Sequence, residues 1–590
     1  MNTFNRAFFA ASVLSVLILL FGVSGPAFAQ SFVPADGNGD TLVSEEELVE
    51  AILAYMEAEY LDEDVSHLQK TELKVAAHNC LHVPFGKVVI PVESEPMSGN
   101  VLNGGGAPTS SVMYEGLITR DSRENCYDCW LAGDWEMSED ANVWTFHIAD
   151  GACWHDGVPV SSEDVKFTHD YIKGKKLWLS SQLSRVDHVE CPDDSTAVFY
   201  LSSAYALFSD SLSHCPGVPI IPKHIWENID SPTGYVDEEF VGSGPFKFKN
   251  RVPGYFEMEA NTGYHGNIPY TENVIFKVFK NKDSEVVALQ SGEIDVVGDI
   301  LPAVARGLEG SEDIKVYAVE DTRGYELGFN VNTYPASIPE FRKAIAHSVD
   351  RENICSIVFS GHARSTETTF LMPSSAHDFV NPDARGCEYN LGKARELLAE
   401  AGFEDIDGDG ILEDADGEDL SVTILAGNSL AETNLATVLK QEWEDELGMV
   451  VNVQIKSDQW QKEVHENPMF TVAMPYLMHD DADDLCHFGS GSFFGKANWY
   501  DYSNPEYDQL VEDIRNTPDR EERKQIGYEM QEILEEDVPT VPICSANTLI
   551  AYRTDRFAGW EDVAPMYWNV VDIKLLSNIK PVSPDVEERE

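Results

Sequence analysis

Residues 143–167 read VWTFHIADGACWHDGVPVSSEDVKF, and this stretch predicts a strand, two tight turns and the start of a helix. Val143–Ile148 alternates aromatic and β-branched residues between two faces, which is typical of a half-buried strand. The Asp-Gly pairs at 150–151 and 156–157 indicate tight turns, because Gly accepts a positive φ and Asp bonds its own backbone. A serine at 161 or 162 is expected to cap the helix, with Glu163 and Asp164 at its positive end.

Short motifs surround this stretch in a fixed order. They are YEGL at 114–117, LAGDWEMSED at 131–140, IPKHIW at 221–226, GSGPF at 242–246, ALQSGEID at 288–295, LGFN at 327–330, FRKAIA at 341–346, LLAEAGF at 397–403, NPEYD at 504–508 and EDVPTVP at 536–542. Together they resemble the peptide-binding class of ABC-transporter solute-binding proteins, solute-binding family 5, over roughly residues 83–579. The resemblance implies an α/β fold: two lobes of the type II periplasmic-binding-protein fold with an additional inserted α/β domain.

The resemblance over residues 83–579, together with the N-terminal patterns described below, divides the chain into parts. The expected parts are a signal peptide at 1–29, a small helical calcium-loop segment at 30–82, lobe I at 83–113, 241–320 and 546–580, the inserted domain at 114–240, lobe II at 321–545 and a disordered tail at 581–590. In lobe I, we expect a helix that ends at Gly292, followed by a strand at 294–297 that belongs to a parallel α/β sheet. In lobe II, strands at 423–425 and 450–455 flank a helix at 431–447, which is one βαβ unit.

The size and charge of the chain restrict its class. At 590 residues it is too long for one hydrophobic core, so two or three domains are expected. Its formal net charge is −61, from 102 acidic against 41 basic residues. Such a surface repels nucleic acid and anionic lipid headgroups, so neither is an expected partner. An acidic surface also suits high salt, because salt screens its self-repulsion.

The N-terminus has the pattern of a secretory signal. Arg6 is followed by an apolar run at 7–23 and by the small-x-small cleavage site Ala27-Phe28-Ala29. A membrane anchor is the alternative, but the apolar run is short for one. The residue directly after the cleavage site is Gln30 and not Cys, so we expect no lipid anchor. The mature protein is therefore expected in the periplasm or outside the cell, including its surface.

All ten cysteines lie after the expected cleavage site. An even number of cysteines in an exported protein favours disulfides, although the pairing does not follow from the sequence. Cys191 and Cys215 flank a strand-like run, and they are the pair that we expect to be bridged.

Residues 36–47 have the twelve-residue spacing of a calcium loop. The expected ligands are Asp36, Asn38, Asp40, Leu42 through its carbonyl, Ser44 and Glu47. Thr41 stands at position 6, where Gly is normal, and the incoming side is too short for a helix. The segment therefore resembles the half-hand of dockerin-type modules. An acidic helix cap that binds no metal is the alternative.

Residues 405–416 form a second loop of the calcium type. The expected ligands are Asp405, Asp407, Asp409, Ile411 through its carbonyl, and Asp416. Here Gly410 occupies position 6, whereas Asp416 replaces the usual Glu at position 12. The alternative is an Asp/Gly turn between a helix and a strand.

An acidic cluster, His479-Asp480-Asp481-Ala482-Asp483-Asp484, follows an expected strand at 470–477. Open α/β sheets present ligand groups at the carboxyl ends of their strands. In peptide-binding relatives a D-x-x-D-P element lies here, and its first Asp takes the ligand's α-ammonium group. Leu485 replaces the proline, so the register stays open between Asp480/Asp483 and Asp481/Asp484. The expected ligand-binding set is Asp480, Asp481, Asp484, Tyr114 and Asn330; a solvated acidic loop is the alternative.

The functional expectation is an exported, monomeric receptor that is not an enzyme. It would close on an oligopeptide or another small polar solute and deliver it to ABC permease and ATPase subunits. Calcium is its one expected metal, in a structural role. A secreted hydrolase is an alternative, although the G-x-S-x-G, HExxH and Walker patterns are missing. A calcium-dependent cell-surface module at residues 32–82 is another.

Overall fold

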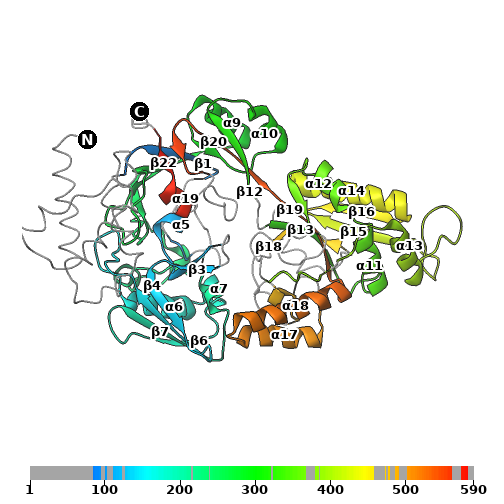
Figure 1. Cartoon of the computed structure of the whole chain (residues 1–590), viewed down its shortest axis with the longest axis horizontal. Coiled ribbons are helices and arrows are strands. Elements are labelled where there is room, and N and C mark those ends of the chain that lie inside the picture. Colours follow the sequence, from blue (N-terminus) through cyan, green and yellow to red (C-terminus); the bar gives the residue numbers. More distant parts are fainter. Residues whose placement is uncertain are drawn as a thin grey trace, which may run out of the picture.

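The computed structural model describes residues 84–94, 100–102, 110–121, 126–213, 217–237, 239–319, 323–366, 379–384, 386–456, 472–473, 476–478, 485–490, 498, 501–560 and 573–582. The predicted signal peptide, the first calcium loop, the acidic cluster and most of the C-terminal tail lie outside these ranges. Figure 1 shows two halves, with lobe I and the inserted domain on one side and lobe II on the other.

Lobe I contains two sheets. The first has the order β1-β10-β9-β8, from Lys87–Val92, Asn273–Val278, Tyr255–Ala260 and Phe246–Val252, and its β1–β10 pair is parallel. The second has the order β11-β20-β12, from Val296–Val297, Thr548–Arg553 and Ile314–Val319. The prediction of a parallel strand at 294–297 is wrong, because β11 pairs with β20 in antiparallel orientation. The helix before it, α9 (Lys282–Ser291), does end at Gly292, whose φ of 77° suits glycine.

The inserted domain is built on one antiparallel sheet with the order β4-β5-β7-β6, from Ala132–Met137, Val143–Ile148, Thr196–Leu201 and Val186–Glu190. The strand predicted at Val143–Ile148 is confirmed, and the buried Trp144 and Phe146 point to one face of it. Helix α6 (Ser162–Lys175) packs on this sheet. Its cap is Ser161, whose backbone N–H and hydroxyl both donate to the Asp164 carboxylate.

Lobe II is built on a mixed sheet with the order β14-β19-β13-β17-β15-β16, in which β18 also pairs with β13. Its strands are Ala363–Ser365, Thr540–Ala546, Arg323–Phe329, Val472–Ala473, Ser421–Ala426, Val450–Ile455 and, for β18, Tyr476–Met478. Strands β15 and β16 are parallel and are joined by α14 (Leu430–Leu447), which confirms the predicted βαβ unit. The other main helices are α11 (Pro339–Ser348), α12 (Arg351–Ile357), α13 (Leu391–Glu400), α17 (Pro505–Asn516) and α18 (Arg520–Asp537).

Shorter elements complete the described part of the chain. They are α5 (Ser110–Met113), β2 (Ile118–Asp121), β3 (Cys126–Cys129), α7 (Phe208–Ser213), α8 (Lys223–Trp226), α10 (Pro302–Leu308), β21 (Phe557–Ala558), α19 (Ile573–Asn578), β22 (Lys580–Pro581) and the 3₁₀ turns at Trp178–Ser180, Pro232–Gly234 and Cys486–Phe488.

Two strand connections join the halves. Strand β12 of lobe I is followed by β13 of lobe II, and β19 of lobe II is followed by β20 of lobe I after the single residue Asn547. Each pair of strands, β12–β20 and β13–β19, is antiparallel within its own lobe. Figure 1 shows these strands running between the halves. A narrow pair of connections of this kind is where a hinge is expected.

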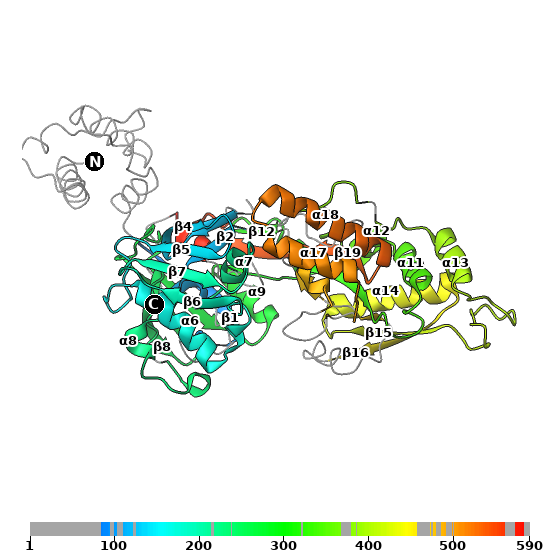
Figure 2. The ribbon, with the colours of Figure 1, turned by 90° about the horizontal axis from the view of Figure 1, so that it is seen from below.

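The halves also touch at a second place, away from the strand connections. The Ala206 N–H of the inserted domain donates to the Arg515 carbonyl of α17 at 2.7 Å, and Arg185 lies 3.6 Å from Glu512. One buried apolar cluster includes Phe208 and Leu212 of α7 together with Val511 and Ile514 of α17. Figure 2 shows α7 and α17 close to each other. The inserted domain therefore rests on lobe II in this structure.

The predicted bridge between Cys191 and Cys215 is not formed in the structure. The Cys191 thiol is free and donates a hydrogen bond to the Ser162 carbonyl at 3.3 Å. This contact ties the start of α6 to the end of β6. Cys215 itself lies outside the described residues.

Candidate functional site

The lobe I side of the candidate site is built around Glu115, which follows α5. Its side chain is fully buried, and a buried carboxylate needs hydrogen-bonding partners to be tolerated. The Tyr264 hydroxyl donates to it at 2.8 Å, and His265 Nε2 lies 3.1 Å from the same oxygen. Burial, together with the charge of Glu115, raises the pKa of Tyr264 well above its usual value. The carboxylate of Glu115 is therefore held in place by two side chains of lobe I.

Tyr114, one of the predicted ligand-binding residues, lies in the core of lobe I. Its ring belongs to the buried cluster with Phe246 and Phe256. Its hydroxyl donates to Asp237 Oδ2 at 3.0 Å, while Asp237 Oδ1 accepts from the backbone of Phe240. Burial raises the pKa of Tyr114 well above its usual value, with Asp237 adding to the shift. The Tyr114 hydroxyl thus holds the segment around Asp237, where the chain passes from the inserted domain back into lobe I.

The GSGPF loop at 242–246 lies directly against the Tyr114 segment. A Cβ atom on Gly242 would be 1.9 Å from the Met113 carbonyl oxygen, and one on Gly244 would be 2.6 Å from that of Val112. The Gly244 N–H donates to the Met113 carbonyl at 2.9 Å. The two glycines are therefore required for close approach of two backbones, and not for a special φ value.

His155 holds the same loop from the inserted domain. The Gly242 N–H donates to His155 Nδ1 at 3.2 Å, so Nδ1 must be the unprotonated nitrogen. His155 Nε2 then carries the proton and donates to the Gly244 carbonyl at 2.9 Å. Burial lowers the pKa of His155, which agrees with this neutral form. The imidazole acts as a two-ended clamp on the glycine loop.

Asn330, the predicted ligand-binding residue of lobe II, follows the last residue of β13. Its side chain is buried, and its Oδ1 accepts from the Asn332 N–H at 3.2 Å. Asn332 Nδ2 in turn donates to the Asp501 carbonyl at 3.4 Å. Asn330 therefore organises the turn after β13.

The acidic cluster lies outside the described residues, but both of its flanks are placed. On one side, Met478 at the end of β18 pairs with Arg323, the first residue of β13 after the connection between the lobes. On the other side, the Leu485 carbonyl accepts from the buried Tyr507 hydroxyl at 2.6 Å. Strand β18, which precedes the cluster in the sequence, therefore ends beside the start of β13 and one of the two strand connections.

The loop at 405–416 brings four carboxylates together. One oxygen from each of Asp405, Asp407, Asp409 and Glu413 lies within 4.8 Å of the others. Glu413 is buried, and its Oε2 accepts from the Ile406 N–H at 2.7 Å. Asp416 is not a member of this group; its N–H donates to Asp414 at 2.9 Å. Four carboxylate oxygens suit a hard cation such as Ca²⁺, with Glu413 in the place assigned from the sequence to Asp416.

Calcium binding at this loop stays a prediction. We expect added calcium to raise the thermal unfolding midpoint, and we expect Asp407→Asn to lose part of that rise, because a bound ion stabilises only the folded loop. The matched control is Asp416→Asn, which removes the same charge outside the group and should keep the full rise. If both variants respond like the unsubstituted protein, or if Asp416→Asn alone loses the rise, the ligand set is different.

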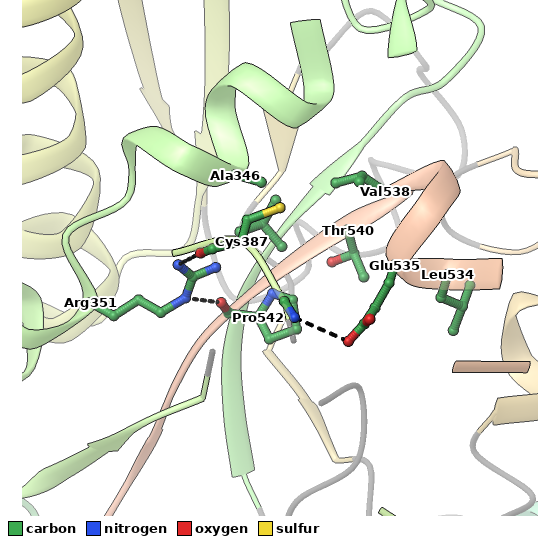
Figure 3. Close-up of a pocket in the computed structure, with 10 residues that line it drawn as sticks. Ala346, Arg351, Cys387, Leu534, Glu535, Val538, Thr540 and Pro542 are labelled. Atoms are coloured by element: carbon green, nitrogen blue, oxygen red, sulfur yellow. Dashed lines mark hydrogen bonds between the residues drawn. The ribbon is translucent and has the colours of Figure 1, made fainter. Parts of the chain in front are cut away.

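A cavity of about 140 Å³ lies inside lobe II, between α18 and β19 (Figure 3). Arg351 spans one wall, with Nε donating to the Pro542 carbonyl at 2.9 Å and Nη1 to the Cys387 carbonyl at 3.0 Å. On another wall, Glu535 accepts from the Gly386 N–H at 3.3 Å. These contacts join helices and strands of lobe II to one another. All residues that line the cavity belong to lobe II, so we do not assign the cavity as the ligand site between the lobes.

The sequence did not assign roles to Glu115, Tyr264, His265, His155 or Glu413. Glu115 stands in the YEGL motif, and this motif was the one feature of the sequence that could have drawn attention to it. Tyr264 and His265 lie about 150 positions further along the chain, in a region without a motif, and only the fold brings them together. Glu413 occupies position 9 of the calcium-type loop, where a ligand was equally possible.

Among the helices that the structure describes, none combines the length and the apolar character needed to span a lipid bilayer.

Comparisons with known proteins agree with this architecture. The family model "Bacterial extracellular solute-binding proteins, family 5 Middle" matches residues 127–499, more than half of the chain. The chain is 28% identical over 481 residues to the oligopeptide-binding protein AppA of Bacillus subtilis, covering 77% of this chain and 85% of AppA. The solved structure of AppA with a nonapeptide matches with a TM-score of 0.67 at 22% identity, covering 85% of this chain and 100% of that one.

A second solved structure extends the comparison. It is a periplasmic oligopeptide-binding protein of an ABC transporter from Thermotoga maritima, bound to mannohexaose. It matches with a TM-score of 0.68 at 22% identity and covers 84% of this chain and 99% of the other. These structural matches show the two-lobe type II fold. With the family model, they lead to one conclusion: the chain belongs to family 5 of the bacterial extracellular solute-binding proteins.

Proposed function

We propose that this protein binds an oligopeptide between its two lobes and delivers it to the permease and ATPase subunits of an ABC importer. The observation that carries the proposal is the pair of strand connections, β12–β13 and β19–β20, as the covalent links between two separately packed lobes. Such connections let the lobes rotate as rigid bodies, and the contact between α7 and α17 would change as they rotate. The similarity to AppA, named as an oligopeptide-binding protein, supports a peptide as the ligand.

The acidic cluster at 480–484 favours a ligand with a cationic end. In the sequence it follows β18, whose Met478 pairs with Arg323 at the start of β13. A carboxylate that accepts from an α-ammonium group makes a charge-assisted hydrogen bond, which is stronger than a neutral one. The peptide backbone brings its own donors and acceptors, so it can be bound with little side-chain specificity. An oligosaccharide, as in the Thermotoga maritima protein, is the second candidate class, and it would not need the cationic contact.

We also propose that the ligand is released unchanged and that the mature protein is exported without a lipid anchor. Family membership supports the first point, because it is a family of solute-binding proteins. The secretory signal pattern at 1–29 supports the second, since the residue directly after the expected cleavage site is Gln30 and not Cys.

The experiment is to identify the ligand that co-purifies with the protein. Protein purified under native conditions is denatured, and the released small molecules are analysed by mass spectrometry. Peptides with free N-termini are the expected result, and the same peptides should be recovered intact after incubation with fresh protein. Recovery of oligosaccharides alone would overturn the peptide assignment but not the solute-binding function. Recovery of cleaved peptides would indicate a hydrolase and would overturn both.

A further inference from the structure

Two buried thiols of lobe II face each other. Cys355 belongs to α12 and is 5% exposed, and Cys544 belongs to β19 and is fully buried. The two thiols interact and are not covalently linked: the interaction with Cys544 lowers the pKa of Cys355, whereas burial raises the pKa of Cys544 well above its usual value. Both belong to the apolar cluster that forms the lobe II core.

The backbone around the pair fixes this arrangement from two sides. Arg351, one helical turn before Cys355, donates to the carbonyl of Pro542, two residues before Cys544. The four residues of helix from Arg351 to Cys355 and the two residues of strand from Pro542 to Cys544 advance by similar distances, about 6 and 7 Å. On the other side, Ser365 of β14 pairs with Cys544 and donates through its hydroxyl to Glu352 of α12 at 2.6 Å. These contacts thus hold α12 and β19 in a fixed position relative to each other, with Cys355 and Cys544 at the same level.

We propose that Cys355 and Cys544 form a disulfide in the mature protein. Family 5 proteins are extracellular, and thiols that meet outside the cytoplasm are normally oxidised. The oxidant is a disulfide donor of that compartment. The two thiols release two protons and two electrons as the S–S bond forms, and the donor disulfide is reduced to two thiols. Because both sulfur atoms are buried in the folded lobe, the exchange takes place before α12 packs against β19.

The bond would have a defined mechanical consequence. Strand β19 continues across Asn547 into β20 of lobe I, so it is one of the two strands that join the lobes. A link from Cys544 to α12 anchors the lobe II end of that strand to a helix of the lobe II core. This inference concerns the integrity of lobe II and stands independently of which ligand the protein binds.

The test is a map of thiols and disulfides in the exported full chain. The protein is denatured without a reductant in the presence of N-ethylmaleimide, digested and analysed by mass spectrometry. The expected result is one linked pair of peptides that contain Cys355 and Cys544 and that separate after reduction. Alkylation of either thiol by N-ethylmaleimide, or a link from either one to another cysteine, would overturn the proposal.

Thermal unfolding gives a second readout that does not depend on the peptide map. A reductant should lower the midpoint of the unsubstituted protein by several degrees, since a disulfide that closes a long loop restricts the unfolded chain. The double variant Cys355→Ala/Cys544→Ala should show a smaller reductant effect. Cys387→Ala, a change at a half-buried cysteine of the same lobe, should keep the full effect. An equal effect of the reductant on all three proteins would contradict the proposal.

Discussion

Replacing Gly242 with alanine should destabilise lobe I severely. The new Cβ would lie 1.9 Å from the Met113 carbonyl oxygen, and His155 holds Gly242 in place by accepting a hydrogen bond from its N–H. Neither segment can move away without losing the Gly244 hydrogen bond to Met113. We therefore expect a loss of about 4 kcal/mol or more in the free energy of unfolding, at the upper end of single-residue effects.

Urea unfolding followed by circular dichroism measures this loss. The matched control is Gly307→Ala in α10 of lobe I, where a Cβ would meet no atom within 4 Å. Because alanine favours a helix over glycine, the control should be stabilised by about 0.5–1 kcal/mol. A Gly242→Ala protein as stable as the unsubstituted one would show that the two backbones do not approach each other in this way.

The second large effect is expected at the acidic cluster. If Asp481 accepts the α-ammonium group of the ligand, Asp481→Asn removes a charge-assisted bond and leaves that ammonium group buried without a counter-charge. Losses of this kind are typically about 2–5 kcal/mol, which corresponds to a weakening of affinity by about thirtyfold or more. Calorimetric titration with the co-purifying peptide measures the change.

Two comparison variants make this result specific. Asp480→Asn tests the other register of the cluster, and only one of the two Asp variants should show the large loss. Glu396→Gln removes the same charge on the exposed face of α13, where it pairs with Lys393, and should leave the affinity unchanged. Equal affinities in all four proteins would exclude the acidic cluster from the ligand contacts.

The regular elements of this fold could be predicted wherever the local pattern was strong. Val143–Ile148 and Val450–Ile455 were predicted with the bounds that the structure has. Both segments are rich in β-branched or aromatic residues that alternate between the two faces of a strand. The helix Leu430–Leu447 was predicted within one residue, since Gly448 ends it in the left-handed region. The pairing of Val296–Val297 was not predicted correctly. Its partner β20 lies about 250 residues further along the chain, so the sequence around Val296 gives no indication of the pairing.

The candidate site was harder to predict for the same reason. The Glu115 carboxylate depends on Tyr264 and His265, which lie about 150 residues further along the sequence, beyond the inserted domain. In the loop at 405–416, the standard spacing assumes that a helix follows and brings position 12 to the metal. Here the chain turns back instead, with isolated bridges from Glu413 to Glu404 and Asp419. That turn directs Glu413 to the three aspartates in place of Asp416.

The measurement that tests the central claim most directly is small-angle X-ray scattering of the ligand-free protein and of the protein saturated with its co-purifying peptide. The claim is that two rigid lobes rotate on β12–β13 and β19–β20 to enclose a solute. The predicted result is a smaller radius of gyration with the ligand and an unchanged circular dichroism spectrum, because the lobes move while their secondary structure stays intact. Identical scattering curves in the presence of confirmed binding would contradict the claim.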